Sequence, residues 1–128
     1  MNQASPLLRQ LMASPDEPAP VAERIANTEA MTATLVALEA GRYTPLVICN
    51  VGRAVQVLLR LEIEKVVELD ATLKESAAEA VEMLARGAKP RPRHLIAARE
   101  MVGFYLDVCD QLSHRDLRGL LDRTMKGN

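Results

Sequence analysis

The sequence has no tryptophan and only three aromatic residues, Tyr43, Phe104 and Tyr105. β-Sheets usually draw on aromatic and β-branched residues, whereas alanine, leucine, methionine and glutamate favour helices. The apolar residues of this 128-residue chain are mostly leucine, valine, alanine and methionine. The composition therefore predicts an all-α fold, and a chain of this length can bury a core as one domain.

Cysteine is scarce as well. Cys49 and Cys109 are the two cysteines of the chain, and neither lies in a Cys-x-x-Cys pair. Two isolated cysteines do not form a disulfide framework. We therefore expect both to be buried free thiols in a reducing compartment.

Long uninterrupted apolar runs are missing. The most apolar run begins at Leu46, but Arg53 and Arg60 interrupt it, so no membrane span is expected. Residues 1–14 lack the basic start and the apolar stretch of a signal peptide. Together with the free thiols, these absences predict a cytoplasmic protein.

Proline is concentrated near the beginning of the chain, with three prolines between Ser14 and Pro20. Ser5-Pro6 is typical of a helix start, because serine caps a helix and proline suits its first position. Three prolines so close together preclude a continuous helix. Residues 1–19 are therefore predicted to form a short helix and a proline-rich linker, followed by a single helical-bundle domain over residues 20–128.

Apolar periodicity and capping residues predict about four main helices in this domain. They cover residues 20–40, residues from Pro45 onward, residues 72–86 and residues 94–112, and a short helix follows from Ser113. Gly41 and Gly87 are expected to end helices, and Thr72 to Glu75 matches a capping box. Since no glycine or proline separates the second helix from the third, residues 46–86 form either one kinked helix or two.

The apolar faces of these helices predict the core. Leu58 and Phe104 are expected inside it, and Glu62 is expected to be paired or to lie near its edge, because an unpaired buried carboxylate is costly. In the first helix the predicted apolar stripe comprises Val21, Ile25, Thr28, Thr32, Leu35 and Leu38.

A second stripe on residues 20–40 consists of alanine: Ala22, Ala26, Ala30, Ala33, Ala37 and Ala40. Small side chains let another helix approach closely. Ala26, Ala30, Ala33 and Ala37 are therefore predicted to form an interface. The helix from Pro45 also has an apolar face too wide for one neighbour. Both features predict a protein-interaction module that self-associates, most simply as a two-fold dimer, with a different protein partner as the alternative.

The distribution of charge suggests a second function. Residues 1–85 carry seven lysines and arginines against twelve acidic residues, a net −5, whereas residues 86–128 carry nine against five, a net +4. The two parts either pack against each other, or the basic part meets an acidic partner or nucleic acid. Lys89, Arg91 and Arg93 are the candidate phosphate contacts. The pI of about 6.1 is low for a nucleic-acid-binding domain, so this function is an alternative.

Four acidic residues suggest a third function. Glu79 and Glu82 form one i,i+3 pair and Asp107 and Asp110 another, and together they could hold Mg²⁺. At these four positions the chain resembles the acidic motifs of the all-α nucleoside triphosphate pyrophosphatases, which implies a Mg²⁺-dependent activity of that kind. The chain departs from the family in having Asp107 where Glu is favoured and in lacking the doubled acid of the first motif. We therefore expect no catalytic residue and no cofactor, and we interpret His94 as a surface or capping residue.

Overall fold

The computed structural model of the chain describes residues 19–112, 116, 119 and 122–124. Four long helices form this part: α2 (Ala19–Glu39), α3 (Pro45–Ile63), α4 (Ala71–Ala85) and α5 (Pro92–Gln111). Residues 116, 119 and 122–124 are also helical, and the described residues contain no strand. The predicted all-α bundle of about four main helices is confirmed. The helix and linker predicted for residues 1–19 lie almost entirely outside the described residues.

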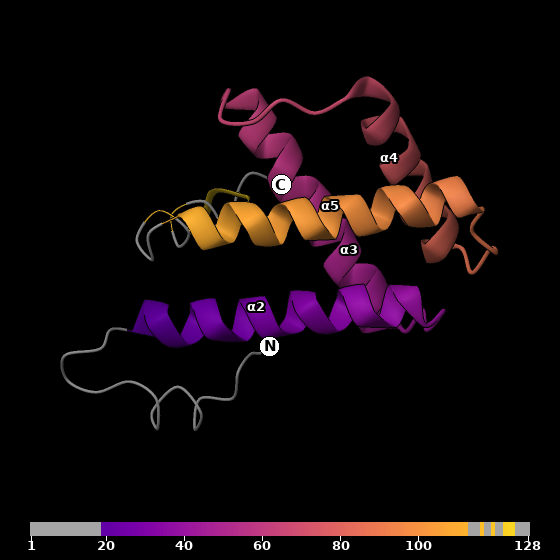
Figure 1. Cartoon of the computed structure of the whole chain (residues 1–128), viewed down its shortest axis with the longest axis horizontal. Coiled ribbons are helices and arrows are strands. Elements are labelled where there is room, and N and C mark those ends of the chain that lie inside the picture. Colours follow the sequence, from indigo (N-terminus) through magenta and orange to yellow (C-terminus); the bar gives the residue numbers. More distant parts are fainter. Residues whose placement is uncertain (1–18, 113–115, 117–118, 120–121, 125–128) are drawn as a thin grey trace.

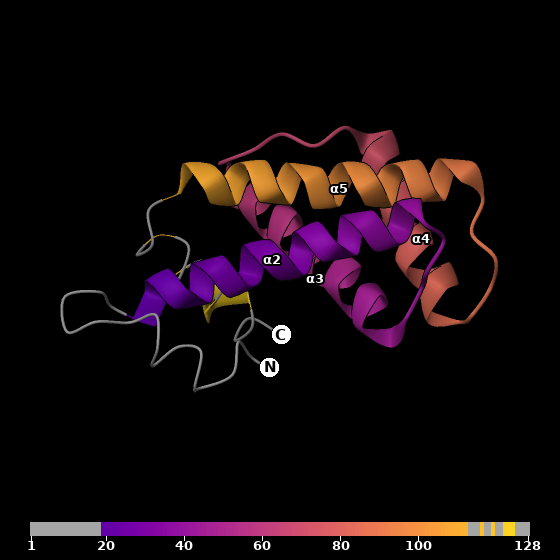
Figure 2. The same ribbon diagram turned by 60° about the horizontal axis from the view of Figure 1, so that its bottom comes forward.

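The helices pack around a crossing of α3 and α5. Helices α2 and α5 run side by side in opposite directions, and α3 crosses them steeply (Figures 1 and 2). Both α3 and α5 pack against each of the other three helices. The wide apolar face of α3 is therefore covered largely within its own chain, and only Leu46 and Ile63 at its two ends are strongly exposed among its large apolar residues.

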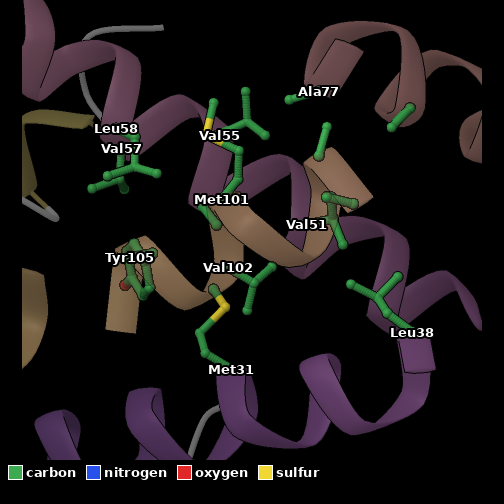
Figure 3. Packing of buried hydrophobic residues seen from close by; sticks show 14 of the residues in the cluster. Met31, Leu38, Val51, Val55, Val57, Leu58, Ala77, Met101, Val102 and Tyr105 are labelled. Carbon is green, nitrogen blue, oxygen red and sulfur yellow. The ribbon is translucent and has the colours of Figure 1, made fainter. Parts of the chain in front are cut away.

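The core fills the space between these helices. Leu58 is fully buried, as predicted, but Phe104 is only half-buried, and its neighbour Tyr105 is the aromatic residue at the centre. Figure 3 shows Met31 of α2 pointing toward Val102 of α5. The fully or nearly fully buried apolar residues include Met31, Val51, Ala54, Val57, Leu58, Ala77, Ala80, Ala98, Met101, Val102 and Tyr105.

The inward face of α2 differs from the predicted stripe. Thr28 and Thr32 are exposed, whereas Asn27 and Thr34 are buried. The prediction was wrong because apolarity alone does not reveal a buried polar residue whose hydrogen bonds are satisfied in the fold.

Two buried hydrogen-bonded groups tie α2 to its neighbours. Tyr105 Oη donates to Asn27 Oδ1 at 2.8 Å, and Asn27 Nδ2 donates to Cys109 Sγ at 3.7 Å. Asn50 Nδ2 of α3 donates to Thr34 Oγ1 at 3.0 Å, and that hydroxyl donates to the Ala30 carbonyl at 2.8 Å. The polar residues in this core are thus held in hydrogen bonds that join three helices.

Three of the helices end in the same way. The N–H groups of Arg42 and Gly41 donate to the carbonyls of Ala37 and Leu38, which is the Schellman pattern, and Gly41 has a φ of 75°. Gly87 ends α4 with the same pattern and a φ of 74°. Helix α3 repeats it at Lys65, the one non-glycine residue with positive φ in the described part of the chain, at 63°. Residues 46–86 are therefore two helices, separated at Lys65.

The start of α4 corrects the predicted cap. Asp70 is the N-cap, and its Oδ2 accepts from the N–H of Leu73 at 3.1 Å, so Thr72 lies inside the helix. Glu62 holds the connection before it: its two oxygens accept from Lys74 Nζ at 2.9 Å and from the N–H of Leu69 at 3.1 Å. The expectation that Glu62 is paired is confirmed, with Lys74 as its partner.

Candidate functional site

A cavity of about 290 Å³ lies between the second half of α4 and the first turn of α5. Gly87 ends α4, and a short connection leads to Arg91, the N-cap of α5. Because this connection is short, it brings charged residues of both helix ends together. The lining residues are Glu79, Glu82, Met83, Arg86, Arg91, Arg93 and His94.

His94 fixes the wall of this cavity. Its side chain is 3% exposed, its Nδ1 accepts from the N–H of Arg91 at 3.3 Å, and its Nε2 lies 3.2 Å from Glu79 Oε1. Since Nδ1 accepts a hydrogen bond, the ring proton belongs on Nε2, which donates to Glu79. Both ring nitrogens are thus engaged, so His94 joins the start of α5 to α4 and has no free lone pair with which to act as a base. This position agrees with the interpretation of His94 as a capping residue.

The guanidinium groups at the cavity are loosely paired. Arg93 Nη2 lies 3.5 Å from Glu79 Oε1, and Arg86 Nη1 lies 4.0 Å from Glu82 Oε1. No ion pair involves Arg91 within the described ranges. Of the three cations proposed to contact nucleic acid, Arg91 and Arg93 therefore line the cavity, whereas Lys89 is exposed on the connection outside its lining.

The four carboxylates proposed as a metal site do not come together. Glu79 and Glu82 line the cavity, next to His94 in the first turn of α5. Asp107 and Asp110 are exposed near the other end of α5, about 20 Å further along its axis at 1.5 Å per residue. Among the described residues, no group of three or more acidic, histidine or cysteine side chains could hold a metal ion. The geometry gives no support to the pyrophosphatase-like alternative.

The alanine stripe of α2 is divided between the inside and the outside of the bundle. Ala37 is buried in the core, Ala26 and Ala30 are half-buried, and Ala33 is exposed. At 100° per residue, the stripe lies on the flank of α2, between its inward and outward faces. Ala37 cannot contact another chain, so the predicted interface is corrected toward the outward side.

The outward side of α2 carries uncharged residues between two glutamates, Glu29 and Glu39. Val36 lies at its centre and is 53% exposed, although exposed helix faces usually carry charged side chains. We call the outer face of α2 the exposed residues Glu29, Thr32, Ala33, Val36 and Glu39, together with Ala40 directly after the helix.

The two thiols differ in environment. Both are free, but Cys49 is exposed, so the prediction that both are buried was wrong for this residue. Burial raises the pKa of the Cys109 thiol, which leaves it protonated and unreactive near neutral pH. Arg24 donates to the carbonyls of Cys109 and Leu112, where a cation suits the negative end of the α5 dipole.

No helix in the described part of the chain has the length and apolar character needed to cross a membrane. Comparison of the chain with models of known protein families, with curated proteins and with solved structures gives no match.

Proposed function

We propose that this protein is a helical interaction module that self-associates as a two-fold dimer through the outer face of α2. The observation that carries the proposal is the exposure of Val36, 53%, on a face whose other members are small or uncharged except Glu29 and Glu39. An apolar helix face that the chain itself leaves uncovered is typical of a binding surface.

The side chains suit close packing of two copies of α2. Ala33 and Ala40 flank Val36 and leave room for a second helix to approach. In a two-fold pair the same residues meet from both sides. If two antiparallel copies of α2 are centred between Ala33 and Val36, Glu29 faces Ala40 of the partner subunit. The exposed Arg42 then lies within one turn of the opposing Glu29, which favours a defined register.

The acidic and basic parts of the chain pair within the fold and so do not by themselves require a partner. Arg123 Nη2 forms an ion pair with Glu64 Oε1 at the end of α3, at 3.0 Å. Arg93 Nη2 of α5 lies 3.5 Å from Glu79 Oε1 of α4. The proposal of self-association therefore depends on the apolar outer face of α2.

Replacement of Ala33 by glutamate tests the proposal. In this register the new carboxylate would lie opposite Val36 of the partner subunit, where no described residue offers it an opposite charge. Light scattering should therefore give the monomer mass for Ala33→Glu and the dimer mass for the unmodified chain. Ala78→Glu is the matched control, because Ala78 is an exposed alanine on α4. Loss of the circular-dichroism helix signal in Ala33→Glu would contradict the proposal, since it would place Ala33 within its own core. A dimer that survives in Ala33→Glu would contradict it too.

We further propose the cytoplasm as the compartment. Both cysteines are unpaired, and Cys49 is exposed on α3. An exposed free thiol persists in a reducing compartment, whereas oxidising compartments favour its conversion to a disulfide.

A further inference from the structure

We propose that the cavity between α4 and α5 binds the terminal phosphate of a small phosphorylated molecule. Three arginines, Arg86, Arg91 and Arg93, are among the residues that line its space of about 290 Å³. Arginine binds phosphate through paired N–H donors whose planar geometry matches two phosphate oxygens. This site is separate from the proposed dimer interface, because none of its lining residues belongs to α2.

The three guanidinium groups keep donors for a ligand. The distances of 3.5 Å from Arg93 to Glu79 and 4.0 Å from Arg86 to Glu82 exceed the ~2.8 Å of a charge-assisted hydrogen bond. Arg86 and Arg93 are also more than half exposed, so their present pairing is weak. Arg91 has no ion pair with any described residue.

The fold holds these groups at the positive end of a helix. Arg91 is the N-cap of α5, and Arg93 is the second residue of this 20-residue helix. A helix N-terminus favours an anion, and here it adds to the side-chain charges. The buried ring of His94 joins this turn to Glu79 of α4, which fixes the cations of α5 relative to Arg86.

Glu79 and Glu82 play unequal parts in the charge of the cavity. Glu79 is engaged with His94 and Arg93, so it belongs to the wall. Glu82 is 70% exposed and holds Arg86 only loosely, so an incoming phosphate would displace it. The remaining Glu82 charge opposes the ligand, and its removal should therefore strengthen binding.

The size of the cavity favours a small molecule over a nucleic-acid strand. A volume of about 290 Å³ lies at the lower end of the range of small-molecule sites. Half-buried Met83 provides an apolar part of the lining for the carbon portion of the ligand. Three arginines line one small cavity, whereas a polymer backbone calls for cations spread along a groove.

Titration calorimetry of the full chain with inorganic pyrophosphate at low ionic strength tests the proposal. We expect saturable binding to one site per chain, with inorganic phosphate binding more weakly. Arg91→Ala and Arg93→Ala should each weaken pyrophosphate binding by about tenfold or more, as expected for the loss of a charged donor. Glu82→Gln should strengthen it. The control is Arg42→Ala, an exposed arginine after α2, which should leave the affinity unchanged.

Three results would overturn the proposal. The first is the absence of binding at millimolar pyrophosphate, and the second is an equal loss of binding in Arg42→Ala and Arg91→Ala. The third is tighter binding of a single-stranded oligonucleotide that Lys89→Ala weakens as much as Arg91→Ala does, which would assign the cations to nucleic acid. The Ala33→Glu variant should bind pyrophosphate like the unmodified chain, so this test is independent of the oligomeric state.

Discussion

Asn27 lies inside the bundle with both ends of its amide engaged. Its oxygen accepts from Tyr105, and its nitrogen donates to Cys109. Burial raises the pKa of Tyr105 well above its ordinary range, with a further contribution from the nearby Cys109. The hydroxyl therefore stays protonated near neutral pH and is the donor in this contact.

Replacement of Tyr105 by phenylalanine tests this contact, because it removes only the hydroxyl group that donates to Asn27. The change leaves Asn27 Oδ1 buried without its donor, which should cost about 1–3 kcal/mol in the free energy of unfolding. Urea denaturation measures this loss. The control is Tyr43→Phe on the half-buried Tyr43, which should change stability by less than about 0.5 kcal/mol. Equal effects of the two substitutions would contradict the assignment.

The stability cost of truncating a side chain should differ between Leu58, which is fully buried, and Phe104, which is half-buried. Leu58 is fully buried, so Leu58→Ala should cost about 2–5 kcal/mol through lost apolar burial and the cavity left behind. Phe104 is half-buried, so Phe104→Ala should cost less, although it removes a larger side chain. Thermal or urea unfolding of both variants gives the order. A greater loss for Phe104→Ala would mean that α5 is rotated relative to this structure.

The break between α3 and α4 contains a non-glycine residue with a positive φ, Lys65. Lys65 adopts the left-handed conformation that glycine adopts at the ends of α2 and α4. This conformation is strained for a residue with a Cβ atom. The break is held by the Schellman hydrogen bonds, by Asp70 as the cap of α4 and by Glu62, which contacts both Leu69 and Lys74.

Lys65→Gly should therefore stabilise the protein by about 0.5–1 kcal/mol, because glycine relieves the strain but loses more backbone entropy on folding. Lys65→Ala is the control: it removes the same exposed side chain but keeps the Cβ atom, so it should give no such gain. A rise in the urea midpoint for both variants would attribute the effect to the lysine charge.

The ion pair of Glu62 should make the stability of the protein depend on pH in the acid range. The hydrogen bond from Lys74, then that from the N–H of Leu69, lowers the pKa of Glu62 below its ordinary value. Its contribution to stability is therefore complete above the unfolded-state pKa, about 4.3 for glutamate, and is lost as the pH falls through the folded-state pKa. Glu62→Gln should lower stability at pH 7 and make it less dependent on pH in the acid range. Glu75→Gln, at an exposed position in α4, is the control. An unchanged acid dependence in Glu62→Gln would contradict this account.

These helix ends also show what can be read from the sequence. Thr44-Pro45 and the glycines at 41 and 87 have strong local preferences, so the corresponding boundaries were predicted correctly. Lys65 has no such preference, so neither the local sequence nor periodicity could separate α3 from α4. Thr72 and Asp70 can both cap a helix, and the contact of Glu62 with Leu69 favours the earlier start.

The same reasoning applies to the site. The sequence predicted Lys89, Arg91 and Arg93 as candidate phosphate contacts, but it did not predict that Arg86 and His94 line the same site as Arg91 and Arg93. The signal available was the short spacing between Gly87, which ends α4, and the N-cap position of Arg91. A short connection places two helix ends close together, whereas the direction of the side chains depends on packing that the sequence does not display.

In the whole molecule, α3 and α5 are covered on several sides, whereas α2 leaves one face open. The wide apolar face of α3 is largely buried by contacts with the other three helices of its own chain. The proposed self-association uses the outer face of α2, around Val36 and Ala33. A stable interface there should bury more than about 1,000 Å² in total.

Sedimentation equilibrium of the unmodified chain over a range of concentrations tests the proposed self-association most directly. We expect a reversible equilibrium between monomer and dimer, with the dimer dominant at micromolar concentration and no larger species. A two-fold contact closes on itself and so stops at two chains. A single monomer mass up to high micromolar concentration would contradict the proposed dimer.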